Sequence, residues 1–170
     1  EAELGPAPAP WAWLAFGSQA RAEQLLGADQ DNGIVIDDGA SASDLAWYLS
    51  LAGRVCDGLA ACGYAYCPGD IMATSDDCRL RLGEWRQRVR RWAQTPTAEA
   101  LMRVGIFFDL RAVHGEATLA RELQQEMLAQ GARNTIFLAA LAASVLDNPT
   151  PLGIFRRFVV ERDGEHRDRL

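Results

Sequence analysis

The sequence predicts an α+β fold, in which two or three short strands alternate with helices and a helical half follows. Two short apolar segments near the N-terminus, residues 11–16 and 32–37, are typical of buried strands. Apolar residues at helical spacing then dominate from about residue 80 to residue 146. Two or three strands with intervening helices, followed by a helical half, indicate an α+β fold.

The first element is a predicted strand over Trp11–Phe16, which ends at Gly17. Ser18 is a favourable helix N-cap, so we expect a helix over 19–26, ended by Gly27. The acidic triplet 29–31 precedes the second predicted strand, 32–37.

The next predicted element is a long helix over 43–62, because its apolar residues recur at helical spacing. Gly63 and Pro68-Gly69 flank an extended segment, 64–73. Helices are then expected over 80–93, 97–114, 117–130 and 133–146, and a late strand over 155–161.

These elements suggest four parts. Residues 1–10 alternate Ala and Pro like a linker, 11–78 form the core, and 79–148 form a helical region. Residues 149–170 hold the late strand and a charged tail, where we expect the chain to be truncated.

The composition excludes several classes of function. The formal net charge of −6 argues against non-specific binding to nucleic acid or to an anionic membrane. All 17 basic residues are arginine, which excludes a P-loop lysine and Schiff-base chemistry. No apolar run approaches the roughly 18 residues of a membrane span and no signal peptide is visible, so we expect a cytoplasmic protein.

The four cysteines form no CxxC pair, which favours reduced thiols. A zinc site built from Cys62, Cys67, Cys78 and His114 is the less favoured alternative, because structural zinc ligands are usually closely paired.

The residues that carry chemistry lie between Gly17 and Gly33. A glycine between strand and helix lets a phosphate approach the backbone, and Ser18 lies where helix N–H groups favour an anion. Asp29 and Asp31 are two residues apart, so on an extended chain they point to the same face, about 6–7 Å apart at Cα. That spacing suits two carboxylates that share Mg²⁺ with phosphate oxygens.

Each feature alone is common, and an Asp-x-Asp pair is also typical of a solvated turn. An EF-hand is excluded, since the twelfth loop position counted from Asp29 is Ala40 rather than Glu. The order strand, Gly-Ser, helix, Asp-x-Asp, strand is more specific than either part.

This order resembles the polymerase-β nucleotidyltransferase superfamily. More closely, the chain is similar to bacterial nucleotidyltransferase-like domains that occur beside cyclic-nucleotide-binding and CBS domains and are related to protein-PII uridylyltransferase. The matching blocks are Gly17-Ser18, Arg21, Glu23-Gln24, Asp29–Gly33, Cys67–Ala73, Phe107–Gly115 and Pro151–Gly153.

The resemblance implies a nucleotidyltransferase fold with a small mixed sheet and a C-terminal helical region that closes over the nucleotide. It implies Asp29 and Asp31 as ligands of Mg²⁺ (or Mn²⁺) and as catalytic residues, with Asp70 as the candidate for a third catalytic carboxylate. The expected nucleotide-binding residues are Gly17, Ser18, Arg21, Asn32 and Arg111.

Two further features have alternative interpretations. Asp109 and Arg111 fall in a predicted apolar helix, where they serve either a phosphate or a structural ion pair. The segment Arg79–Arg91 holds six arginines and one glutamate, which is typical of a solvated helix face or of a basic patch that attracts a nucleotide or an acidic partner.

The leading hypothesis is an Mg²⁺-dependent transfer of an NMP group from an NTP to a hydroxyl of a protein or small molecule. The alternative is a non-catalytic nucleotide-binding module in a larger signalling protein. Expected partners are NTP, a protein acceptor and fused cyclic-nucleotide-binding or CBS domains, with no membrane and no nucleic acid.

Overall fold

The structure is a computed structural model that describes residues 3–24, 27–95, 97–135, 137–139, 142, 161–163 and 166–169. A four-stranded sheet lies at the centre of the fold, in the order β3-β2-β1-β4. β1 (Trp11–Phe16) pairs antiparallel with β2 (Asn32–Ile36) and with β4 (Leu110–Gly115), and β3 (Arg79–Arg81) lies parallel to β2. The expected α+β fold with a small mixed sheet is therefore confirmed.

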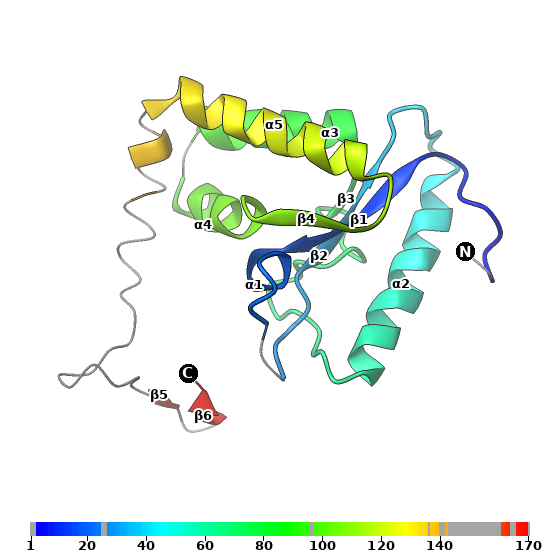
Figure 1. Ribbon diagram of the computed structural model, residues 1–170, viewed down its shortest axis with the longest axis horizontal. Helices are drawn as coiled ribbons and strands as arrows, with labels where there is room; N and C mark the ends of the chain where they lie inside the picture. The colour runs from blue at the N-terminus through cyan, green and yellow to red at the C-terminus, as the bar shows by residue number, and fades with distance from the viewer. Residues whose placement is uncertain are drawn as a thin grey trace.

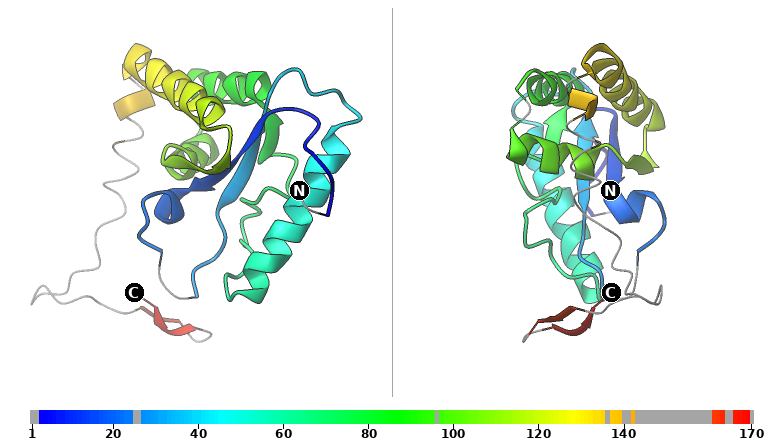
Figure 2. Two further views of the ribbon diagram at one scale, coloured as in Figure 1. Left: turned by 45° about the vertical axis from the view of Figure 1, so that its right-hand side comes forward. Right: turned by 90° about the vertical axis from the view of Figure 1, so that its left-hand side faces the viewer.

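Helices cover both faces of this sheet (Figure 1). α2 (Leu45–Ala61) lies on one face, and α3 (Leu82–Gln94) and α5 (Ala117–Arg133) lie on the other. α4 (Ala98–Phe107) precedes β4 and also lies on the α3 side. The views of Figure 2 show the sheet between these two helical layers.

Side-chain alternation along the strands builds a separate core on each face. Trp13 and Ile34 point toward α2, whereas Leu14 and Val35 point toward α3 and α5. Phe107 brings the end of α4 into the second core, because its ring packs edge-on against Phe16 and Trp85. Both central strands are buried on both faces, so the sheet is a rigid support for whatever lies at its ends.

The predicted helix over 97–114 is wrong. α4 ends at Phe107, and Leu110–Gly115 forms the edge strand β4. The backbone of 110–115 obtains its hydrogen bonds from β1, a partner nearly 100 residues earlier in the chain, and local helical spacing carries no information about such a pairing.

The third extended segment is also shifted. Within 64–73 the structure has one isolated bridge, between Asp29 and Ala65, and the third strand is instead β3. α3 begins at Leu82 because the Glu84 carboxylate accepts the backbone N–H of Arg81 at 2.8 Å, which caps the helix there.

The C-terminal expectations lie mostly outside the described residues. Of the predicted helix 133–146, residues 135, 137–139 and 142 are helical, and 155–160 of the late strand are not described. β5 (Glu161–Asp163) and β6 (His166–Arg169) form an antiparallel pair. Across the ranges given above, none of the helices combines the length and apolarity that crossing a bilayer requires.

Candidate functional site

The backbone of residues 29–32 is held on two sides at one end of the sheet. The N–H of Phe16 donates to Asp31 O at 2.9 Å, at the end of β1. On the other side, Gln30 N–H donates to Ala65 O at 2.9 Å and Asn32 N–H donates to Ile71 O at 3.0 Å. These bonds keep the segment extended, so its side chains alternate between two sides.

The amide side chains point toward α2 and are fully buried. Gln30 Nε2 donates to the carbonyls of Cys56 and Tyr64, each at 3.0 Å. Asn32 Oδ1 accepts the N–H of Ala73 at 2.9 Å. Asn32 therefore connects β2 to the 71–73 segment, and its side chain is fully buried.

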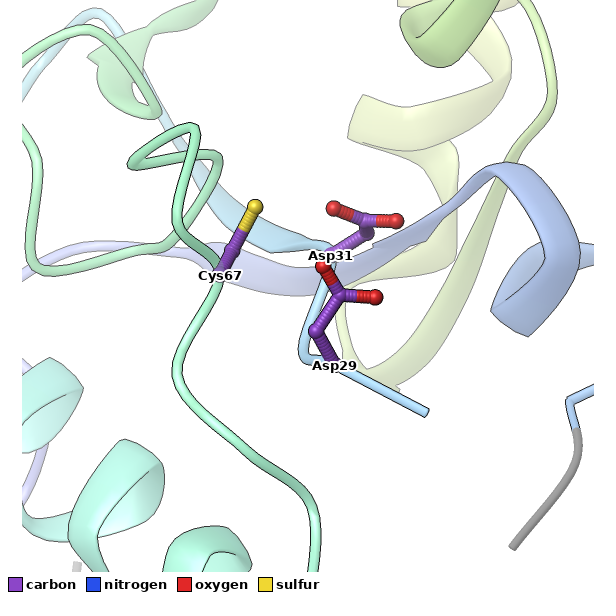
Figure 3. Close-up of side chains that lie close together, drawn as sticks. All are labelled: Asp29, Asp31 and Cys67. Carbon is purple, nitrogen blue, oxygen red and sulfur yellow. The ribbon is translucent and has the colours of Figure 1, made fainter. Parts of the chain in front are cut away.

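The two acidic side chains point the other way and meet the thiol of Cys67 (Figure 3). Each of the three residues offers one ligand atom, and these atoms lie within 4.8 Å of one another. Asp29 is exposed, whereas Asp31 and Cys67 are half-buried. We call these three residues the acidic group.

Charge repulsion and burial both act on this group. Burial raises the pKa of Asp31 above its ordinary value, and the charge of Asp29 raises it further, while a hydrogen bond with Cys67 acts in the opposite direction. Burial likewise raises the pKa of the Cys67 thiol. A buried carboxylate whose ionisation is disfavoured, beside a second carboxylate, is a donor set that a divalent cation would stabilise.

The glycine–serine bend adjoins the acidic group. Gly17 has φ +52, a conformation that favours glycine, and its N–H donates to Asp109 O at 3.0 Å. A Cβ placed on Gly17 would lie 3.9 Å from Asp31 Oδ2. The bend and the carboxylates therefore share one site, as the sequence predicts.

The helix after the bend differs from the prediction. α1 spans only Gly17–Ala20, and its N-cap is Phe16, without a side-chain cap. Ser18 thus lies inside a single turn rather than at the start of a helix over 19–26, of which residues 25–26 are not described. One turn has little macrodipole, so attraction of an anion here depends on individual N–H groups and nearby cations.

Arg21 is one of those cations. Its Nε bonds Glu23 Oε2 at 2.7 Å, and its Nη1 pairs with Asp109 Oδ2. These bonds raise the pKa of Arg21, so it stays charged. Asp109 is therefore the partner of Arg21, and it does not orient Arg111.

Arg111 has a different set of partners from the one expected. It projects from β4, and its guanidinium donates to Ala20 O at 3.0 Å and to Gln19 O at 3.1 Å. A cation bonded to the last carbonyls of a helical turn stabilises that turn. Arg111 supports α1, which in turn carries the bend.

Asp70 lies outside the acidic group. It is exposed, in a turn where its backbone has φ +56 and its N–H donates to Cys67 O at 3.0 Å. The same turn instead brings Cys67 to the carboxylates. The sequence analysis named Cys67 only in the less favoured zinc alternative and as the start of the Cys67–Ala73 block, and did not place it beside Asp29 and Asp31.

His114 lies on β4 and is not a member of the acidic group. It belongs to β4 opposite Trp13, and its ring lies against that of Trp11 with centroids 5.6 Å apart. It lines an apolar cavity of about 350 Å³ on the α2 face, with Leu51 and Val55.

Two family models match the chain. Residues 1–99 match the family described as "Putative nucleotidyltransferase DUF294", a stretch that contains β1, β2, α2, α3 and the whole acidic group. The chain belongs to this family. Residues 135–170 match a second model, described as "Putative nucleotidyltransferase substrate binding domain". No curated protein and no solved structure matches the chain.

Proposed function

We propose that this nucleotidyltransferase-family domain transfers an NMP group from an NTP to a hydroxyl of a protein or small molecule, with a divalent cation held by Asp29 and Asp31. The observation that carries the proposal is the position of these two carboxylates next to the Gly17 bend. Metal ligands and a backbone open to phosphate oxygens are the two parts that phosphoryl-type transfer needs in one place.

The residues at the site suit Mg²⁺ or Mn²⁺. Asp29 and Asp31 supply hard oxygen ligands, and burial, followed by the charge of Asp29, raises the pKa of Asp31, a cost of ionisation that a bound cation would offset. A bound ion would supply charge neutralisation for the triphosphate. In this proposal Ser18 and N–H groups of the bend contact phosphate oxygens, and Arg21, at 44 % side-chain exposure, would exchange one of its present partners, Glu23 or Asp109, for a phosphate.

The proposed reaction is a displacement at the α-phosphorus. A bond forms between the acceptor oxygen and this phosphorus, the bond to the β-phosphate oxygen breaks, and pyrophosphate leaves as the hydroxyl proton is lost. The domain contributes positioning and charge, and no covalent intermediate on the protein is required. Asp70 remains the proposed third carboxylate, a role that requires its exposed turn to approach the acidic group.

A second candidate is a module that binds nucleotide without transferring it. It is favoured by the composition of the acidic group, in which the third member is the thiol of Cys67 and not a carboxylate. Under this alternative, the domain would report nucleotide level to attached cyclic-nucleotide-binding or CBS domains in the cytoplasm.

The first test is thermal unfolding with and without Mg²⁺ and each NTP. A ligand at about 100 times its Kd adds about 2.7 kcal/mol to folding, which for a domain of this size raises Tm by roughly 5–10 °C. The double variant Asp29→Asn, Asp31→Asn should lose this shift, whereas Asp57→Asn, an exposed carboxylate on α2 that accepts from Tyr66, should keep it. An unchanged wild-type Tm with every NTP would contradict both candidates.

The second test separates the candidates. An NTP labelled at the α-phosphate is incubated with the protein and cell lysate. Covalent label on an acceptor together with pyrophosphate release supports transfer. Metal-dependent binding with neither product supports the binding module.

A further inference from the structure

The arginine-rich segment Arg79–Arg91 is largely neutralised within the fold. Five of its six arginines make ion pairs with carboxylates: Arg79 with Asp76, Arg81 with Glu84, Arg86 with Glu122, Arg88 with Asp77, and Arg90 with Glu126. The sixth, Arg91, has no ion pair with a carboxylate among the residues that the structure describes. Two of these pairs, those of Arg86 and Arg90, connect α3 to α5, and the other three are made with acids close in the sequence, so Arg91 is the exception.

Arg91 lines a pocket between the last turns of α3, the 76–78 turn and the start of α4. The pocket has a volume of about 420 Å³, within the range of small-ligand sites. Its lining includes Asp77, Arg88, Arg91, Trp92, Thr95 and Arg103. None of these residues belongs to the acidic group, so the pocket is a separate feature of the molecule.

The charges of this lining are unequal. Asp77 is shared, because Arg88 Nη2 donates to its Oδ1 at 2.8 Å and Arg103 Nη1 donates to its Oδ2 at 3.4 Å. Arg88 Nη1 also donates to the backbone carbonyl of Asp77 at 2.5 Å, which fixes the guanidinium plane. Among the lining residues that the structure describes, one half-exposed carboxylate is accompanied by three guanidinium groups, of which Arg91 makes no ion pair with a described carboxylate, in a protein whose net charge is −6. A local excess of positive charge in an acidic protein favours an anionic ligand.

Trp92 provides an aromatic wall. One face of its indole stacks on Phe107, with centroids 5.3 Å apart and planes 14° from parallel. The side chain is only half-buried, so the part that Phe107 does not cover is left to line the pocket. An aromatic surface beside guanidinium groups suits a ligand that carries both a ring and a phosphate.

The ends of α3 and α4 at the pocket do not determine the sign of its electrostatic potential. α3 ends at Gln94 and α4 begins at Ala98, so a partly negative and a partly positive helix terminus both lie at the pocket and offset each other. The sign of the potential therefore depends on the arginines. Planar guanidinium groups bind phosphate oxygens in pairs, which a point charge does not do.

We propose that this pocket is a second ligand site, which binds a phosphorylated small molecule through Arg91 and Arg88, with a ring of the ligand on Trp92. Its occupancy does not require a metal ion, unlike the site proposed at Asp29 and Asp31. The two sites thus allow a nucleotide or other phosphate ester to be sensed independently of the substrate.

The test is isothermal titration calorimetry, in which the whole chain is titrated with inorganic phosphate, pyrophosphate or AMP in the presence of EDTA. We expect AMP to bind to the wild type. Arg91→Gln should lower the affinity for AMP about tenfold, because it removes one charge-assisted hydrogen bond worth roughly 1.4 kcal/mol. Arg90→Gln is the matched control, because it removes the same charge from the neighbouring position, where the side chain is 51 % exposed and pairs with Glu126. It should change the affinity less than about twofold.

Two further measurements locate the ligand. The indole N–H signal of Trp92, assigned in NMR spectra with Trp92→Phe, should shift on addition of AMP. The double variant Asp29→Asn, Asp31→Asn should bind AMP under EDTA as the wild type does. The proposal is overturned if no probe binds, or if an acidic peptide binds where phosphate and AMP do not. It is also overturned if Arg91→Gln binds AMP like the wild type, or if Arg90→Gln loses as much affinity for AMP as Arg91→Gln does.

Discussion

Asp31 and Asn32 are neighbours in the sequence and point to opposite sides of the same extended backbone. Asp31 faces Asp29, Cys67 and the Gly17 bend, whereas Asn32 is fully buried toward α2 and accepts the N–H of Ala73. The two residues therefore have different roles: Asp31 belongs to the candidate site, and Asn32 holds the backbone of that site in place.

Asp31→Asn should stabilise the metal-free protein while it weakens metal-dependent nucleotide binding. The folded-state pKa of Asp31 is raised above 3.8 by burial and by Asp29, so ionising it costs folding free energy. That cost is fully present above the raised pKa and disappears as the pH falls toward the unfolded value. We expect a gain of about 1 kcal/mol at neutral pH and none in acid, measured by urea unfolding at several pH values.

A loss of stability at neutral pH in Asp31→Asn would contradict this account of the site. Asp57→Asn serves as the control, because Asp57 is exposed and its side chain bonds Tyr66 rather than a member of the acidic group. It should change the free energy of unfolding by no more than about 0.5 kcal/mol.

Asn32→Ala should destabilise the fold by about 2–3 kcal/mol, because it leaves the buried N–H of Ala73 without its acceptor. The measurement is the free energy of unfolding in urea. Asp29→Asn, an exposed change three residues earlier, should alter it by less than about 1 kcal/mol. Equal effects of the two variants would show that Asn32 has no special structural role.

The four cysteines should react with iodoacetamide at very different rates. Burial raises the pKa of Cys78 to about 12, so its thiol stays protonated and inaccessible near neutral pH, whereas Cys62 is exposed. Peptide mass spectrometry should find Cys62 alkylated within minutes and Cys78 only after unfolding. Cys67 should react slowly, and Mn²⁺ with an NTP should slow it further if the ion is held beside it.

The ion pair between Arg90 and Glu126 predicts a pH-dependent link between α3 and α5. A hydrogen bond from Arg90 lowers the pKa of Glu126 below 4.5, so the stabilisation is present above pH 4.5 and is lost as the pH falls through the lowered pKa. Glu126→Gln should cost about 0.5–1 kcal/mol at neutral pH, because the pair is partly exposed. Acid titration of unfolding should bring the variant and the wild type together.

The elements that local pattern defines were predicted from the sequence. β1 has the bounds expected, Trp11–Phe16, because six apolar residues before a glycine with positive φ leave few alternatives. The long helix expected over 43–62 is α2, Leu45–Ala61. The proximity of Gly17 to Asp31 followed from the order of strand, bend and acids.

The elements that depend on distant partners were not predicted. β4 forms because β1 has a free edge there, and the acidic group includes Cys67 because a turn 36 residues after Asp31 returns to it. Arg111 bonds the carbonyls of Gln19 and Ala20, contacts that its position in the sequence does not indicate. Such pairings are properties of the folded chain, which residue spacing does not encode.

The backbone bonds that hold residues 29–32 between β1 and the 65–71 segment have a consequence for selection of a ligand. These bonds fix the backbone from which both carboxylates extend, so the points where the two side chains begin keep the same separation whichever ion is present. The Asp31 side chain is half-buried and that of Asp29 is exposed, so adjustment to a larger or smaller cation should come from rotation of Asp29.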